Sequence, residues 1–123
     1  MGLDWNKLQE QALKEIEATL EALPLPLRQQ AQKLAVTFEH KPNSGLQGDG
    51  IEEDTLGLFT GAELADPGAQ VLPPQIILFL DNLWDLAEGS EKVFSDEVRT
   101  TFLHELGHFL GLDEDDLTDR GLD

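Results

Sequence analysis

The sequence predicts an α+β fold in which a small mixed or antiparallel sheet packs against an N-terminal helix and a C-terminal helix. Two long segments with apolar residues at helical spacing lie toward the two ends of the chain, and three short strand-like runs lie between them. The chain has 123 residues, of which 40% are hydrophobic, and this size suits one domain over residues 1–123 with a single core.

The first predicted helix begins after Asp4, a residue type that accepts a hydrogen bond at the N-cap, and runs to about Ala22. Apolar residues recur along it every three or four positions: Trp5, Leu8, Ala12, Ile16 and Leu20. The two prolines within residues 23–26 end this helix, and a short helical turn is expected over residues 27–33. The segment therefore predicts an amphipathic helix that covers a core.

Three strands are expected between the two main helices, over residues 34–39, 55–60 and 75–81. The first two are separated by residues 41–54, which are rich in glycine and polar residues and predict a mobile loop. A turn is expected at Pro67-Gly68, before the third strand. Because the strands are short and lie between helices, they predict a small sheet.

The C-terminal helix is expected to begin at Ser95, a good N-cap residue that is followed by two acidic residues in the first turn. Its apolar residues fall within an arc of about 140° on a helical wheel. They are Val98, Phe102, Leu103, Leu106, Phe109 and Leu110. Thr101, His104 and His108 form a separate stripe, and Gly111 is expected to end the helix in a left-handed turn.

The segment from His104 to Glu114, HELGHFLGLDE, carries the clearest chemical signal in the sequence. His104 and His108 are one helical turn apart on the same face, so both imidazoles can bind one metal ion. Glu105 follows the first histidine and is the natural general base. A bound zinc ion lowers the pKa of its water to about 7, and a nearby carboxylate can then accept a proton from that water. The pattern predicts a zinc hydrolase, although two histidines and a carboxylate also suit other divalent metals.

The third metal ligand is expected just after the helix, where the turn at Gly111 leads into four consecutive acidic residues, 113–116. A layout with a third histidine would need His at position 114, but this chain has Glu114. A layout with a glutamate on a distant downstream helix would need more than the 15 residues that follow His108. One of the four acids is therefore expected to complete the site.

These motifs resemble the minimal-zincin type of small bacterial metallopeptidase, whose signature is HExxHxxGxx followed by Asp or Glu. Further similarity lies in a Leu-Pro pair at 23–24, the strand at 34–39, a Gly-aromatic segment at 56–61 and the apolar strand at 76–80. Together these features cover residues 5–122.

The resemblance implies a peptidase in which His104, His108 and Glu114 bind zinc and Glu105 is the catalytic base. The third ligand stays open, because Asp113 and Asp115 flank Glu114. The resemblance also implies that the strand over residues 76–80 lines the cleft and pairs with a substrate as a peptide-binding edge. The alternative for this strand is a plain buried core strand, which its five consecutive apolar residues favour.

Composition excludes some partners and points to a compartment. The formal charge is −17, with 25 acidic and 8 basic residues, which disfavours nucleic acid and anionic membranes as partners. A peptide or protein substrate is expected instead. The chain has no cysteine, its first residues lack a signal-peptide pattern, and no apolar run is long enough to span a membrane. We therefore expect a cytoplasmic protein; the sequence leaves its oligomeric state open.

One element of peptidase chemistry is missing, because the chain has no tyrosine that could stabilise an oxyanion. Arg99, Arg120 and His40 are the remaining candidates, with Arg99 expected to be structural and His40 expected at the surface. This gap keeps a second hypothesis open, that of a metal-binding protein with a non-catalytic binding or regulatory role. A zinc hydrolase acting on RNA is a third, less favoured by the charge.

Overall fold

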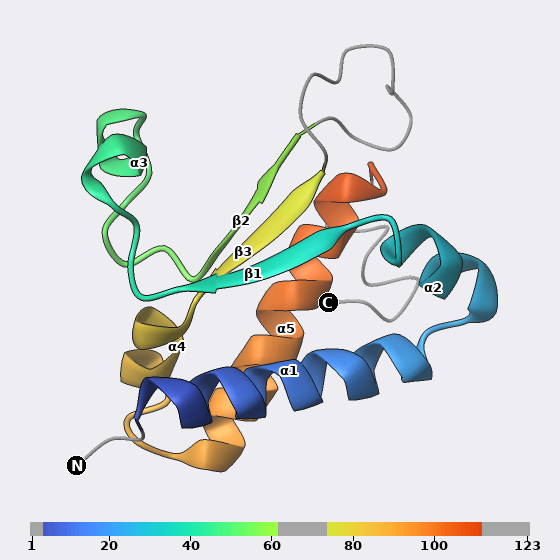
Figure 1. Cartoon of the computed structure of the whole chain (residues 1–123), viewed down its shortest axis with the longest axis horizontal. Coiled ribbons are helices and arrows are strands. Elements are labelled where there is room, and N and C mark those ends of the chain that lie inside the picture. Colours follow the sequence, from blue (N-terminus) through green and yellow to red (C-terminus); the bar gives the residue numbers. More distant parts are fainter. Residues whose placement is uncertain (1–3, 62–73, 112–123) are drawn as a thin grey trace.

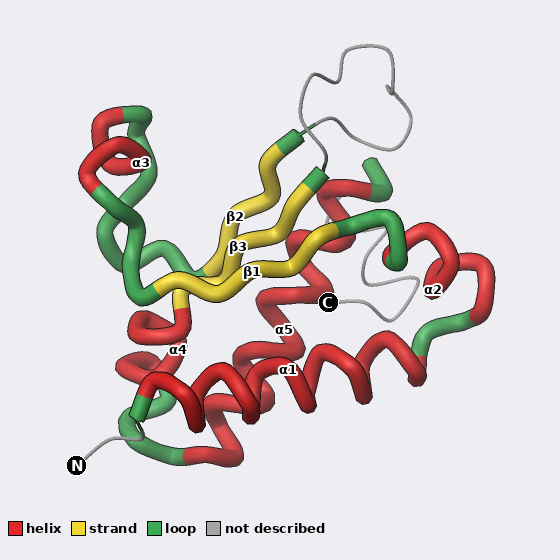
Figure 2. The backbone as a smooth tube through the Cα atoms, viewed as in Figure 1, coloured by secondary structure: helices red, strands yellow, loops and turns green. Residues whose placement is uncertain are grey.

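The computed structural model describes residues 4–61 and 74–111 of the chain. Figure 1 and Figure 2 show a small sheet with the two longest helices below it. The elements in chain order are α1 (Trp5–Ala22), α2 (Leu25–Ala31), β1 (Ala35–Glu39), α3 (Ser44–Gly48), β2 (Gly57–Thr60), β3 (Gln75–Phe79), α4 (Leu80–Leu86) and α5 (Glu91–Phe109). The predicted α+β fold, with a small mixed sheet, an N-terminal helix and a C-terminal helix, is confirmed.

The sheet has the strand order β1-β3-β2, so β3 is its central strand. β3 pairs in parallel with β1, aligning Val36 with Ile76, and antiparallel with β2, aligning Gly57 with Leu78. The expectation that this strand is a peptide-binding edge is therefore wrong, and the core-strand alternative is right. The physical reason is that both edges of β3 are already paired with other strands, so neither is open to a peptide. Ile76 and Leu78 are also completely buried.

The core lies between the sheet and α5, and α1 packs on α5. Figure 1 shows α1 (blue) crossing α5 (orange) below the sheet. Alternation along the strands turns Ile76 and Leu78 to the same face as Gly57 and Phe59 of β2. Phe59 meets Phe109 of α5 at a ring-centroid distance of 5.9 Å. α5 is thus held directly against β2 and β3, and its polar stripe lies near β2.

The helix starts show one prediction confirmed and one corrected. Asp4 caps α1 by accepting a hydrogen bond from the Lys7 backbone N–H at 2.9 Å, as expected. α5 begins at Glu91 and not at Ser95, because Ser90 accepts from the Val93 N–H at 3.2 Å. The additional turn buries Phe94 completely, which gives the helix a packing reason to begin earlier.

Ser95 lies inside α5 and binds another element. Its hydroxyl oxygen accepts a hydrogen bond of 2.9 Å from the Gln11 side chain of α1. The same Gln11 amide also donates to the Glu91 carbonyl at 2.8 Å. Ser95 therefore helps to join α1 to α5.

Short elements account for the other differences from the prediction. Residues 41–54 are not loop throughout, because they contain α3. Asn43 caps this helix, since its side chain accepts a hydrogen bond from the Leu46 N–H at 2.9 Å. α2 begins at Leu25, two residues earlier than expected. α4 follows β3 without a loop and was not predicted. The expected Pro67-Gly68 turn lies outside the described residues.

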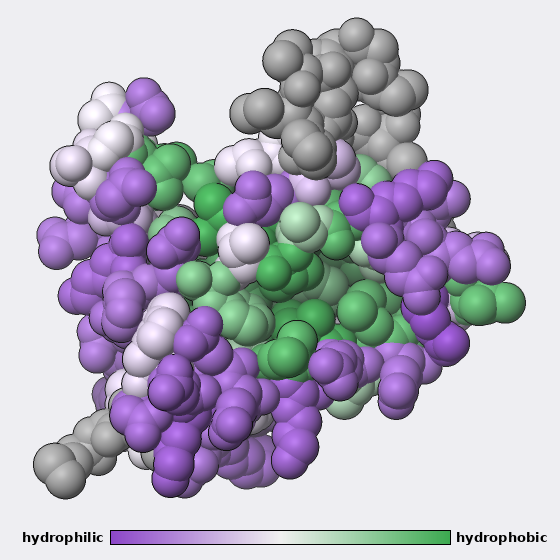
Figure 3. All heavy atoms as spheres, in the orientation of Figure 1, coloured by the Kyte–Doolittle hydropathy of each residue, from purple (hydrophilic) through white to green (hydrophobic). Residues whose placement is uncertain are grey.

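One face of the molecule is largely polar. Figure 3 shows hydrophilic side chains over most of one face, with apolar ones gathered in the middle, between β1 and α1. Among the helices that the structure describes, none combines the length and apolar character needed to cross a membrane.

Candidate functional site

The last two turns of α5 bring His104, Glu105 and His108 together. The Nε2 atoms of His104 and His108 are 3.2 Å apart, with the two rings edge to face at a centroid distance of 4.8 Å. One ligand atom from each of the three residues lies within 4.8 Å of the others. Across residues 4–61 and 74–111, this is the one group of three or more histidine or acidic side chains so arranged.

The packing of α5 explains why these polar side chains are presented on one side. The apolar stripe buries Phe102, Leu103 and Leu106 against the core. His104 and Glu105 are half-buried, and His108 is exposed. The predicted separation of an apolar face from the histidines is thus observed, although Thr101 of the predicted polar stripe is buried, with 8% exposed.

β2 approaches the polar stripe closely at Gly57. A Cβ atom at this position would lie 2.6 Å from Thr101 Cγ2, 3.2 Å from Leu78 Cδ2 and 3.4 Å from Glu105 Cγ. The first of these distances is too short for any side chain larger than hydrogen. Glycine therefore allows β2 to pass directly over α5 beside Glu105.

A cavity of ≈ 350 Å³ opens where β2 and α5 meet. Leu56 and Gly57 line it from the strand side, and His104 and Glu105 line it from α5. Thr100, Thr101 and Glu97 complete the lining. The candidate catalytic carboxylate and one candidate ligand thus share a cavity beside a strand.

The donor set fits a divalent metal ion. Two imidazole nitrogens at helical spacing, with a carboxylate beside them, are ligand types that zinc and several other transition metals accept. His104, His108 and a third side chain would hold such an ion. The predicted third ligand Glu114 and its alternatives Asp113 and Asp115 lie outside the described residues.

None of the three candidate oxyanion residues is found in the His104 cavity: two lie away from it, and the third is outside the described residues. His40 Nδ1 is 3.1 Å from both carboxylate oxygens of Asp81, and its ring stacks on Trp5 at 3.8 Å. Arg99 Nε is 4.0 Å from Glu15 Oε1 of α1, in keeping with a structural role. Neither residue lines the His104 cavity, and Arg120 is outside the described residues.

Reasoning from the sequence did not identify Leu56, Gly57 or Thr100 as lining residues of the site. Gly57 did leave a signal, because a glycine inside a strand often marks a close approach of another element. The sequence does not show which element comes close to Gly57, because this depends on how β2 packs against α5.

Comparison with known proteins agrees with this geometry. The model of a family described as zincin-like metallopeptidase matches residues 31–122, well over half of the chain. The matched region begins at the end of α2 and includes the sheet, α4 and α5. No curated protein matches the chain. The resemblance inferred from the HELGH motif is thereby confirmed, and the chain belongs to the zincin-like metallopeptidase family.

Proposed function

We propose that this protein is a zinc-dependent peptidase that hydrolyses peptide bonds in the cavity between β2 and α5. The observation that carries the proposal is the convergence of His104, Glu105 and His108 within 4.8 Å, beside a strand. Membership of the zincin-like metallopeptidase family supports it.

In this proposal His104, His108 and Glu114 would hold the ion. A bound zinc ion would supply Lewis-acid chemistry, which lowers the pKa of water and polarises a carbonyl group. Glu105 accepts the proton of the attacking water and passes it to the departing amine, acting first as base and then as acid. Glu105 is half-buried and lines the cavity together with Gly57, so its carboxylate lies where the proposal needs it.

The free edge of β2 is the proposed binding surface for the substrate backbone. β2 pairs with β3 on one side, and no strand among residues 4–61 and 74–111 pairs with its other side. The backbone groups of residues 57–60 on this edge could bind an extended peptide as an added strand. Because Leu56 and Gly57 line the His104 cavity, such a peptide would pass beside Glu105.

The test combines metal content with cleavage. We expect about one zinc ion per chain in the wild type and in Glu105→Gln, and loss of zinc in His104→Ala and His108→Ala. His40→Ala is the matched control, because this histidine contacts Trp5 and Asp81 instead. Cleavage of a mixed peptide library, followed by mass spectrometry, should fall by a factor of about 10² to 10⁴ in Glu105→Gln. Failure of the wild type to bind zinc would overturn the proposal.

The third ligand has its own test. Glu114→Ala should weaken zinc binding more than Asp113→Ala, Asp115→Ala or Asp116→Ala, because the family resemblance assigns the ligand to position 114. Affinities measured by competition with a coloured chelator would rank the four variants. Equal affinities would remove Glu114 from the proposed site.

A second candidate function is metal-dependent binding without hydrolysis. It is favoured by one observation: no arginine, and no histidine besides His104, lines the described part of the cavity to stabilise an oxyanion. Under this alternative, wild type and Glu105→Gln would bind peptides equally well and neither would release products.

A further inference from the structure

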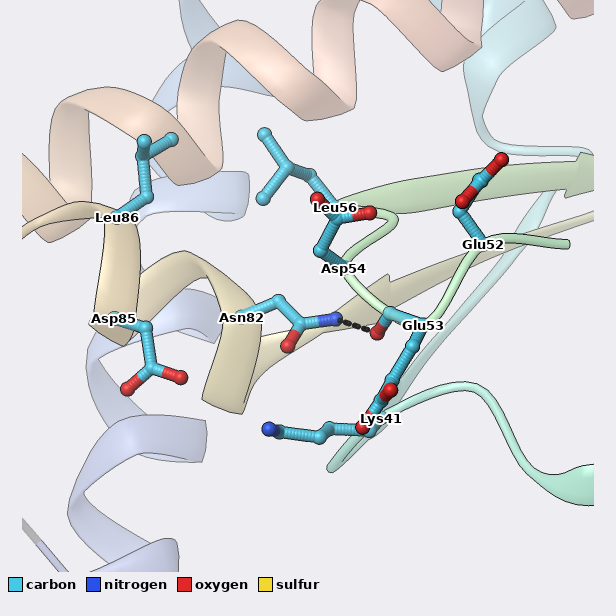
Figure 4. A pocket seen from close by; sticks show the side chains of 8 residues that line it. All are labelled: Lys41, Glu52, Glu53, Asp54, Leu56, Asn82, Asp85 and Leu86. Atoms are coloured by element: carbon cyan, nitrogen blue, oxygen red, sulfur yellow. Dashed lines mark hydrogen bonds between the residues drawn. The ribbon is translucent and has the colours of Figure 1, made fainter.

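A second and larger pocket adjoins the proposed active site. Its volume is ≈ 620 Å³, and it lies between the segment over residues 52–56 and the helix α4 (Figure 4). Leu56 lines both this pocket and the His104 cavity. Leu56 directly precedes Gly57, the first residue of β2, so the second pocket lies beside the start of this strand.

The pocket is strongly acidic. Four carboxylates line it, those of Glu52, Glu53, Asp54 and Asp85. The lining includes a single basic residue, Lys41, and none of the four carboxylates forms an ion pair with another described residue. These charges raise the local concentration of cations more than the general charge of the protein does, because they surround a concave space.

Asn82 adds a fixed hydrogen-bond acceptor to the lining of the pocket. Its side chain is buried, with 7% of the residue exposed. The side-chain nitrogen donates to the carbonyl oxygens of Glu53 at 2.8 Å and Thr55 at 2.9 Å. These two bonds use both amide protons and fix the orientation of the amide. The Oδ1 atom accepts no hydrogen bond from the described residues, and Asn82 lines the pocket (Figure 4).

The arrangement suits an organic cation better than a metal ion. Carboxylates that hold a divalent metal must converge on one point, and within the described chain only His104, Glu105 and His108 form such a cluster. The acidic groups here are spread around a wide pocket. Leu56 and the half-exposed Leu86 provide apolar walls beside them. An aliphatic stem with a charged end, as in lysine or arginine, matches both features.

We infer that this acidic pocket binds a lysine or arginine side chain of the peptide whose backbone lies along the edge of β2. The methylene stem packs on Leu56 and Leu86, and the charged head meets the carboxylates and Asn82 Oδ1. This inference rests on the proposed peptidase function, because it assigns a substrate class to the same site. It predicts that cleavage occurs a few residues from a basic residue.

The experiment uses two peptides that differ in one charge. A fluorescent, otherwise uncharged peptide carries either arginine or citrulline, which has nearly the same shape without the charge. Binding is measured by anisotropy with the zinc-loaded Glu105→Gln protein, so that hydrolysis does not interfere. We expect the arginine peptide to bind about tenfold more tightly, because several partly screened charge contacts act together.

Matched variants separate the pocket from the general charge of the protein. Glu53→Gln/Asp85→Asn should abolish most of the tenfold preference. Glu17→Gln/Glu21→Gln removes the same amount of charge from exposed positions of α1, and this variant should retain the tenfold preference. Lys41→Gln should strengthen binding of the arginine peptide, whereas Lys33→Gln should not.

A second pair of variants tests the apolar wall. Leu86→Ala should weaken binding of both peptides, because each carries an aliphatic stem. Leu13→Ala is the control, since Leu13 is 49% exposed on α1 and Leu86 is 50% exposed. Circular dichroism would show that all variants keep the fold.

The outcomes distinguish the inference from the proposed function. Equal affinity for the arginine and citrulline peptides, or equal loss of the preference in both double variants, would overturn the inference. If the wild type cleaves library peptides without preference for nearby basic residues, the inference fails and the peptidase function stands. Charge-selective binding without any cleavage would support the pocket and refute the peptidase function.

Discussion

Gly57 is the residue whose lack of a side chain most directly shapes the surroundings of Glu105. Thr101 is buried, with 8% exposed, and its methyl group occupies the space into which a Cβ on Gly57 would project. The same Cβ would contact Glu105 Cγ at 3.4 Å. The absence of a side chain at Gly57 therefore lets β2, the proposed binding strand, lie close to Glu105, the proposed base.

Gly57→Ala is expected to reduce the free energy of unfolding by about 1–3 kcal/mol, because an added methyl overpacks a filled space. Adding Thr101→Ser removes the closest atom and should recover part of this loss. Urea unfolding measures both effects. Gly48→Ala is the control, since a Cβ there meets nothing within 4 Å. An equal loss in the control, or no recovery in the double variant, would contradict the steric explanation.

The two ends of α5 show how elements depend on residues outside their own periodicity. Gly111 has φ 75°, the left-handed conformation expected where the helix ends. Ser90 is the N-cap of α5 and sets where the helix begins. The two residues before it, Glu88 and Gly89, have positive φ, as Gly111 does. The additional N-terminal turn places Phe94 in the core, where its ring meets Trp84 of α4 at 5.6 Å.

Two serine substitutions test which residue caps α5. Ser90→Ala should lower the free energy of unfolding by about 1 kcal/mol, the usual cost of a lost N-cap. Ser95→Ala loses only the contact with Gln11, which still donates to the Glu91 carbonyl, so its effect should be about half as large or less. Denaturant unfolding of the two variants gives the order. A larger loss in Ser95→Ala would favour the cap inferred from the sequence.

What the sequence predicts at the element scale follows from local signals. α1 and the strand β1 carry clear local signals, so they are close to their expected positions, whereas α5 begins earlier than expected, at Glu91. α4 was missed because it follows β3 without a loop, and its first residue, Leu80, continues the apolar run of that strand. The apolar run of β3 indicates a buried strand, but the strand order β1-β3-β2 depends on pairing with residues far away in the chain.

The same division holds for the candidate site. The HELGH spacing predicts how His104, Glu105 and His108 converge, because one helix determines all three positions. Leu56 and Gly57 join the cavity only through the packing of β2 on α5. The sequence placed His40 at the surface, and the structure adds its stacking on Trp5 and its pairing with Asp81. Such contacts between distant segments require the fold.

At the scale of the whole molecule, the charge of −17 acts on stability. The ion pairs within the described residues, Lys92–Asp96, Arg99–Glu15 and His40–Asp81, all involve partly or largely exposed side chains. Exposed pairs stabilise a protein little, typically by about 1 kcal/mol or less. Repulsion among the excess carboxylates is therefore largely uncompensated in the folded state.

Salt should consequently stabilise the protein. Raising NaCl from about 0.01 M to about 1 M shortens the screening length from about 30 Å to about 3 Å. The midpoint of urea unfolding should rise over this range, and it should rise less in Glu17→Gln/Glu21→Gln, which begins with fewer charges. A midpoint that stays constant or falls would show that charge repulsion does not limit stability.

Metal binding connects the site to the stability of the whole fold. The proposed ligands His104 and His108 lie on α5, which packs against both the sheet and α1. An ion that binds only the folded state at 100 times its dissociation constant stabilises that state by about 2.7 kcal/mol. Zinc should therefore raise the melting temperature of the wild type, Glu105→Gln and His40→Ala, and a chelator should reverse the increase. His104→Ala and His108→Ala should melt at the same temperature with and without zinc. If zinc stabilised these two variants as much as the wild type, its binding site would lie away from α5.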